Sequence, residues 1–161
     1  MSRLFLRRCA STSTSFIQRA REAKSAQVLL GPFRTNRSFD LCLEEAGFDV
    51  KSIGVEGARC ELTVTRSIAN NFGTLHGGAA STLVDVVGTL ALLGRDPTRP
   101  GVSVEMNQSF TSAAKVGQRV LAVGTVLKYG KSLGFTEVEL RCADDASRIF
   151  AVGRHTKFLA T

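Results

Sequence analysis

The sequence predicts a single-domain α+β fold in which an antiparallel sheet wraps around one long helix. A chain of 161 residues suits one domain. It contains one long helix-like run, within residues 70–94, and strand-like segments on both sides of that run. Short turns join these segments, and consecutive strands joined by short turns pair antiparallel.

The N-terminal 40 residues hold eight basic and two acidic residues, a net +6 of the whole chain's +7. Residues 1–21 contain five Arg, a Ser/Thr cluster and no acidic residue, which is typical of mitochondrial transit peptides. We therefore expect a transit peptide or else a disordered basic leader at 1–21. The expected location is the mitochondrial matrix, with the cytosol as the alternative. The other 121 residues carry 13 basic and 12 acidic groups, so the charge implies no nucleic-acid partner.

Residues 22–46 are expected to form a helical segment ahead of the main domain, which we place at residues 47–161. A short helix over residues 17–30 would stop at Gly31–Pro32. A second short helix, in SFDLCLEEAG, would use Ser38 or Asp40 as its N-cap and end at Gly47.

Two strand-like segments, residues 48–57 and 58–67, precede the long helix and resemble a hairpin separated at Gly57. In the second segment Cys60, Leu62 and Val64 alternate with polar neighbours, which is the period of a half-buried strand. Four further strands are expected after the helix, at residues 101–110, 118–130, 133–142 and 148–158.

The run from Gly77 to Leu93 places apolar residues at nearly every helical azimuth. A helix that is apolar all round is a buried helix, and the Gly-, Pro- and charge-rich residues 94–101 end it. A sheet must then wrap around this helix, which is the arrangement called the hotdog fold. No run of 18 apolar residues occurs, so no membrane-spanning segment is predicted.

Polar residues stand at the start and in the middle of this apolar run. A helix N-terminus offers unpaired N–H groups and a positive dipole end, and Gly77 lets a ligand approach the backbone closely. His76 either supports such a site or is a loop histidine bonded to backbone. Asp85 would be an unpaired carboxylate among apolar neighbours, which is costly. It is either a catalytic base or nucleophile, or a cap for a neighbouring loop.

Four motifs occur in order along the chain: N-x-x-G-T-L-H-G-G-x-x-x-T-L-V-D from Asn70, G-V-S-V-E-M-N from Gly101, K-x-G-K-S-L-x-F from Lys128 and G-R-H-T-K from Gly153. Together they strongly resemble the hotdog acyl-CoA thioesterases, with bacterial phenylacetyl-CoA thioesterases as more distant relatives. The resemblance covers about residues 45–159 and excludes the leader.

The resemblance implies hydrolysis of acyl-CoA to a free acid and coenzyme A. In the family, the residues matching Gly77 and Asn70 polarise the thioester carbonyl, and His76 supports that site. The residues matching Asp85 and Ser103 orient and activate the hydrolytic water. The alternative for Ser103 is a small strand residue without a role.

The resemblance also implies a set of contacts to the coenzyme A part of the substrate, from two segments rich in cations and turn amides. For each single cation, ordinary solvated charge is the alternative. One departure from the family is Phe158, which stands where a His follows the terminal HTK. The implied contact residues are Glu105, Phe110, Thr111, Ser112, Ala113, Ala114, Lys115, Lys128, Tyr129, Gly130, Lys131, Ser132 and Leu133.

Gly77 and Asp85 are eight residues apart on one helix, or about 12 Å at 1.5 Å per residue. Groups that far apart are poorly placed to act on one thioester carbon, whereas a second, antiparallel copy of the helix could bring one chain's Asp85 to the other chain's Gly77. We therefore expect a homo-oligomer with shared active sites, and the resemblance implies a dimer of dimers, a homotetramer.

No metal or separate cofactor is expected, because two His and four Cys offer no zinc-binding spacing and coenzyme A belongs to the substrate. Two alternatives share the fold. A hotdog hydratase or dehydratase would use a His with a carboxylate in another motif context. A non-catalytic acyl-CoA binding protein would keep the basic turns without Asp85, so the presence of Asp85 favours catalysis.

Overall fold

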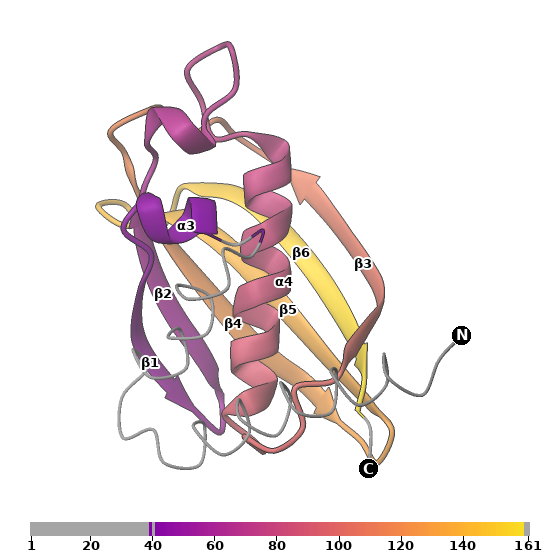
Figure 1. Cartoon of the computed structure of the whole chain (residues 1–161). Coiled ribbons are helices and arrows are strands. Elements are labelled where there is room, and N and C mark those ends of the chain that lie inside the picture. Colours follow the sequence, from indigo (N-terminus) through magenta and orange to yellow (C-terminus); the bar gives the residue numbers. More distant parts are fainter. Residues whose placement is uncertain (1–38, 40, 160–161) are drawn as a thin grey trace.

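The computed structural model describes residue 39 and residues 41–159, and its elements follow the predicted order (Figure 1). The predicted leader, the helix over residues 17–30 and both N-cap candidates, Ser38 and Asp40, lie outside the described residues. The helical elements are α3 (Leu41–Glu45), the short 3-10 helix η1 (Arg66–Ile68) and α4 (Gly77–Leu93). The strands are β1 (Asp49–Gly54), β2 (Gly57–Thr63), β3 (Val102–Phe110), β4 (Arg119–Tyr129), β5 (Leu133–Cys142) and β6 (Ile149–Phe158).

The six strands form one antiparallel sheet in the order β1-β2-β4-β5-β6-β3. The sheet curves around α4, which packs on β2, β4, β5 and β6 (Figure 1). The α+β hotdog prediction is therefore confirmed. Because α4 connects β2 to β3, the chain crosses the sheet and places β3 at the far edge, where β6 is its partner.

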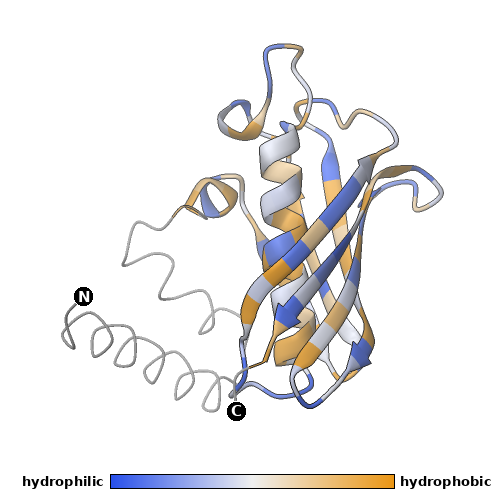
Figure 2. Cartoon of the chain, turned by 90° about the vertical axis from the view of Figure 1, so that its right-hand side faces the viewer, coloured by the Kyte–Doolittle hydropathy of each residue, from blue (hydrophilic) through white to orange (hydrophobic). Residues whose placement is uncertain are grey.

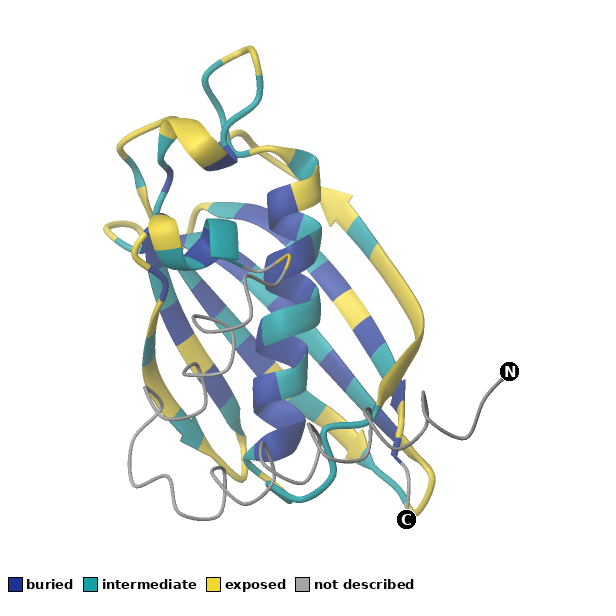
Figure 3. Ribbon diagram, viewed as in Figure 1, coloured by how far each residue is buried: buried dark blue, intermediate teal, exposed yellow. Residues whose placement is uncertain are grey.

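Alternation along the strands creates the face on which the helix lies (Figures 2 and 3). Every second residue of β5, including Val138 and Leu140, is buried, and its neighbours are less covered. Glycine permits the closest approach of helix and sheet: a Cβ atom at Gly124 would lie 2.9 Å from the carbonyl oxygen of Val87. The core therefore occupies the space between the sheet and one side of α4.

Local details refine the predicted boundaries. β2 ends at Thr63 instead of continuing to residue 67, since its partner β4 begins opposite, at Arg119. Residues 55–56 form the hairpin turn, and Gly57 belongs to β2. Gly47 ends α3 as expected: its φ of 73° is the left-handed conformation that glycine adopts at helix ends.

The helix α4 spans the predicted residues, but the prediction that it is apolar and buried on all sides was wrong. Four small or polar residues spaced by four positions form a stripe along one side of the helix: Gly77, Ser81, Asp85 and Thr89. All four are only half-buried, whereas the residues on the sheet side are buried (Figure 3). Within the described residues the sheet covers one side of α4, and it contacts the stripe from one edge, through the neighbouring strands β3 and β6, which leaves the stripe partly exposed.

No helix among the described residues is long and apolar enough to cross a membrane. The three described cysteines, Cys42, Cys60 and Cys142, are free thiols. Burial raises the pKa of the Cys60 thiol to about 12, so this residue is a packed, unreactive thiol at neutral pH.

Candidate active site

The start of α4 presents an unpaired backbone donor. The ring of His76 is the N-cap, and its Nδ1 accepts a hydrogen bond from the Gly78 N–H at 2.9 Å. The Ala80 N–H donates to the His76 carbonyl at 3.0 Å. Among the described residues no group accepts a hydrogen bond from the Gly77 N–H. Gly77 thus offers a hydrogen-bond donor at the positive end of the helix dipole.

Asn70 shapes the loop in front of this helix. Its Oδ1 accepts from the Phe72 N–H at 3.0 Å and from the Thr74 N–H at 3.1 Å. Its Nδ2 donates to the Thr74 hydroxyl at 2.9 Å. An amide nitrogen carries two hydrogens, so the second N–H of Asn70 is left for another acceptor. Asn70 therefore has a structural role in the loop as well as a donor at the site.

A cavity of about 340 Å³ lies at this end of α4. Asn70 and Gly77 line it from one side, and Phe110 from the end of β3 lines it from another. A Cβ atom at Gly77 would lie 3.5 Å from the Phe110 ring, so glycine leaves the backbone of the helix start open to the cavity. Four further residues with a predicted coenzyme A contact also line it: Thr111, Ser112, Ala113 and Ala114.

Asp85 lies in the middle of α4, with Ser103 of β3 and His155 of β6 beside it. The Ser103 hydroxyl donates to Asp85 Oδ1 at 3.4 Å, and His155 Nε2 lies 2.8 Å from Ser103 Oγ. His155 Nε2 is also 3.5 Å from Asp85 Oδ1. The side chain of Asp85 is 49% exposed, so the expectation of a carboxylate buried among apolar neighbours was wrong. Within residues 41–159 the partners of the Asp85 side chain are Ser103 and His155, and no loop amide donates to it, which argues against the loop-cap alternative.

Comparison with known proteins identifies the family of this chain. A model of the thioesterase superfamily matches residues 72–149. Acyl-coenzyme A thioesterase 13 of Mus musculus is 40% identical over 121 residues, which cover 75% of this chain and 84% of that protein. Its Homo sapiens counterpart is 46% identical over 100 residues, or 62% and 71% of the two chains. The chain belongs to the thioesterase superfamily. As a member it is a thioester hydrolase, as the sequence motifs predicted.

Crystal structures of related thioesterases share the fold. Zebra fish thioesterase superfamily member 2 superposes with a TM-score of 0.77 at 35% identity, covering 86% of this thioesterase and 100% of that chain. Thioesterase superfamily member 2 from Mus musculus gives a TM-score of 0.72 at 37% identity, covering 83% and 93% of the two chains.

Sequence reasoning missed two residues of this thioesterase that lie beside Asp85. His155 is fully buried, and Lys157, two positions further along β6, is 6% exposed. The Lys157 ammonium donates to the Thr89 hydroxyl at 2.7 Å. Burial lowers the pKa of both side chains, and the nearby Asp85 carboxylate opposes both shifts. One feature of the sequence could have indicated them. His155 and Lys157 are two positions apart in a predicted strand, so both lie on the inward face, whose other residues are small or apolar.

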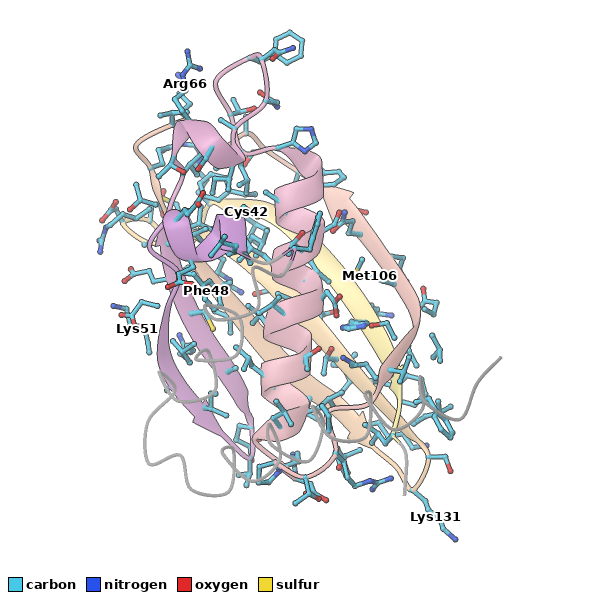
Figure 4. The ribbon with its side chains drawn as sticks, in the orientation of Figure 1. Cys42, Phe48, Lys51, Arg66, Met106 and Lys131 are labelled. Atoms are coloured by element: carbon cyan, nitrogen blue, oxygen red, sulfur yellow. The ribbon has the colours of Figure 1, made fainter. Side chains whose placement is uncertain are left out.

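The structure does not bring all the predicted site residues of the thioesterase together in one chain. Gly77 and Asp85 stand two turns of α4 apart on the same stripe. Phe110 and the residues after it lie near the start of α4, whereas the β4–β5 turn with Lys131 lies at the opposite end of the sheet (Figures 1 and 4). The two segments predicted to contact coenzyme A are therefore far apart within one subunit.

The β4–β5 turn is held in place from two directions. The guanidinium of Arg99 donates to the carbonyl oxygens of Lys131 and Leu159 and lies 5.8 Å from the centre of the Tyr129 ring. The side chain of Lys131 is exposed and extends away from the sheet (Figure 4). Phe158 is half-exposed and pairs with Leu133 across the sheet. This residue, which stands where the family has His, therefore adds apolar surface beside the turn.

Of the remaining predicted contact residues, Glu105 lies outside both segments, and Lys115 ends the first segment, beside Thr74 in the loop before α4. Glu105, on β3, accepts hydrogen bonds from Asn107 Nδ2 at 2.7 Å and from the Thr156 hydroxyl at 3.3 Å. Lys115, in the β3–β4 loop, is exposed, and its backbone N–H donates to the Gln118 side chain at 2.7 Å. Among the described residues no cluster of His, Cys, Asp and Glu could hold a metal ion.

Proposed function

We propose that this thioesterase hydrolyses acyl-CoA thioesters to a carboxylic acid and coenzyme A. One observation carries the proposal: a half-exposed carboxylate, Asp85, and a helix N-terminal donor, the Gly77 N–H, which has no acceptor in the described part of the chain, lie on one half-exposed stripe of α4. Hydrolysis requires a base for water and a donor for the developing oxyanion. The relatives named acyl-coenzyme A thioesterase 13 support coenzyme A as the thiol part of the substrate.

Each group has a defined part in the proposed reaction. The Gly77 N–H and the second N–H of Asn70 donate to the thioester carbonyl oxygen. Asp85 accepts a proton from water as the water oxygen bonds to the carbonyl carbon. When the tetrahedral intermediate collapses, the carbon–sulfur bond breaks and that proton passes to the departing sulfur. Ser103 orients Asp85 through the hydrogen bond to Oδ1.

We further propose that two subunits share each active site. β3 is a nine-residue edge strand, and its apolar side chains Val102, Val104 and Met106 are 67%, 56% and 42% exposed. A long apolar edge of this kind invites pairing with another strand. Pairing β3 with β3 across a two-fold axis would continue the sheet and lay the two α4 helices antiparallel. Asp85 would then approach the partner's Gly77. The dimer of dimers expected from the resemblance is a further proposal.

The same arrangement offers coenzyme A a continuous surface. The β4–β5 turn of one subunit would approach the segment from Phe110 to Lys115 of the other, since these segments lie at opposite ends of one chain (Figure 1). We propose that Lys128 and Lys131 bind the phosphates of the substrate there, because exposed cations and turn amides suit phosphate groups.

Replacing either lysine is expected to weaken binding more than catalysis. In Lys128→Ala and Lys131→Ala, KM should rise by roughly threefold to tenfold with little change in kcat, because an exposed ionic contact contributes about 1 kcal/mol. The difference from wild type should shrink at high salt. Lys51→Ala, which removes an exposed cation from the far edge of the sheet, is the matched control. An unchanged KM in both turn variants would place the phosphates elsewhere.

The acyl-CoA specificity is tested by a substrate panel. We expect thiol release from coenzyme A esters and much weaker release from esters of small thiols, which lack the phosphates. The panel should span short, long and aromatic acyl groups. Binding of acyl-CoA without thiol release would support the non-catalytic alternative and contradict the proposal.

One observation bears on the hydratase alternative, because His155 does lie beside a carboxylate, at 3.5 Å. The ring is fully buried behind Ser103, however, so it cannot reach a substrate carbon. Water addition to a 2-enoyl-CoA is therefore not expected, and loss of its ultraviolet absorbance without thiol release would show otherwise.

A further inference from the structure

Lys157 is a buried cation that the proposed reaction does not use. Among the described residues its Nζ has one hydrogen-bond partner, the neutral Thr89 hydroxyl, and Thr89 in turn donates to the Asp85 carbonyl at 2.8 Å. Burying an ammonium group with so few partners is costly. The acidic group whose charge acts on it is Asp85. Because burial of the Lys157 ammonium is unfavourable, its position beside Asp85 indicates that it acts on this proposed base.

The surroundings of the His155 ring determine which of its two nitrogens carries the hydrogen. Nε2 contacts the Ser103 hydroxyl, whereas Nδ1 is buried without a hydrogen-bond partner among the described residues. A Cβ atom at Gly88 would lie 3.1 Å from Nδ1, so this side of the ring faces bare helix backbone. A hydrogen on Nδ1 would be an unpaired buried donor, and Nε2 would then lack a hydrogen to donate. The neutral ring therefore carries its hydrogen on Nε2.

We propose that Lys157 and His155 are positioning residues for hydrolysis: the Lys157 ammonium, held by Thr89, adds positive charge beside the His155 ring, Nε2–H of that ring donates to Ser103, and the Ser103 hydroxyl donates to Asp85. This proposal rests on the proposed function. These donors hold Oδ1 of Asp85, which is the oxygen of this carboxylate that has hydrogen-bond partners among the described residues. Oδ2 is left to accept the proton of the attacking water.

The charges around His155 act on its protonation in opposite senses. Burial of the ring has the largest effect and favours the neutral form, and Lys157 on β6 adds to it, whereas Asp85 on α4 and Glu105 on β3 both favour the protonated ring. β5 contributes Thr136, which is neutral, and its hydroxyl donates to the His155 carbonyl at 3.1 Å. Lys157 is thus the positive charge that counters the two carboxylates. Loss of this charge would leave burial alone to oppose the two carboxylates and would favour an ion pair between His155 and Asp85, which competes with Ser103 for the base.

The chain has two histidines, which makes the proposal accessible to nitrogen-15 NMR. The signals are assigned by comparison with His76→Gln. We expect His155 in the wild-type protein to be neutral at pH 7, with its hydrogen on Nε2. In Lys157→Met the loss of the cation should raise the pKa of His155, since Lys157 lowers it. Lys157→Arg retains the charge and should keep the pKa low.

Kinetics separate positioning from general stability. Lys157→Met should lower kcat by roughly tenfold with KM changed by less than about twofold, and Lys157→Arg should recover most of the loss. Lys51→Met is the control for loss of a cation. If Lys157→Met does not fold, the tautomer and charge of His155 in wild type and in Lys157→Arg still decide the matter.

Three results would overturn the proposal: a hydrogen on Nδ1 or a charged His155 ring in the wild type at neutral pH, an unchanged His155 pKa in Lys157→Met, or an unchanged kcat in that variant. A failure of the proposed function would give a different result from a failure of this inference. In that case the wild-type protein itself releases no thiol from acyl-CoA, whatever the NMR measurements give.

Discussion

Asp85→Asn is expected to lower kcat by ~10²–10⁴-fold, the usual contribution of a general base. The amide matches the carboxylate in shape but cannot accept the proton of water. The fold should persist, because the side chain is 49% exposed and its recorded partners are Ser103 and His155. Thiol release from acyl-CoA under saturating substrate measures the loss, and thermal unfolding followed by circular dichroism measures stability.

The matched control is Asp49→Asn, which neutralises an exposed carboxylate on β1, at the opposite edge of the sheet from β3 and Ser103. It should leave kcat within about twofold of wild type, as surface substitutions usually do. If Asp85 had a purely structural role, Asp85→Asn would keep most of the activity and lower the unfolding temperature instead. That pattern would remove Asp85 from the proposed reaction.

Mixing two inactive variants is expected to restore activity. One variant is Asp85→Asn, and the other combines Asn70→Ala with His76→Ala, which disables the helix start. If each site takes Asp85 from one subunit and the oxyanion donors from the other, a mixed dimer contains one site with both lesions and one intact site. A purified heterodimer should therefore show about half of the wild-type activity per dimer.

Two different affinity tags on the variants allow the heterodimer to be isolated after subunit exchange. Each homodimer alone should be inactive. Because Asn70 also shapes its loop, the circular dichroism spectrum of each homodimer is compared with that of the wild type, and it should match if the fold is kept. An isolated heterodimer without activity would show that each site is built within one chain. The separation of about 12 Å between Gly77 and Asp85 would then be an insufficient argument.

Local sequence patterns predicted much of the fold. The bounds of α4 and β5 agree with the prediction because each element has a continuous pattern of its own and is flanked by turn-forming residues. The β2 end at Thr63 could not be predicted in this way, because it depends on where β4 begins. The order of the motifs along the chain also predicted the superfamily, and with it thioester hydrolysis.

The sequence by itself thus determined the elements, the class of fold and the open helix start at Gly77. The tertiary structure decided what surrounds Asp85. β3 and β6 are separated by two strands along the chain and become neighbours only through the order of the sheet, which brings Ser103 and His155 to the same carboxylate. Burial of Lys157 and exposure of the stripe on α4 follow from the same order. Strand order depends on long-range packing that no local period records, so these features could be found only in the folded chain.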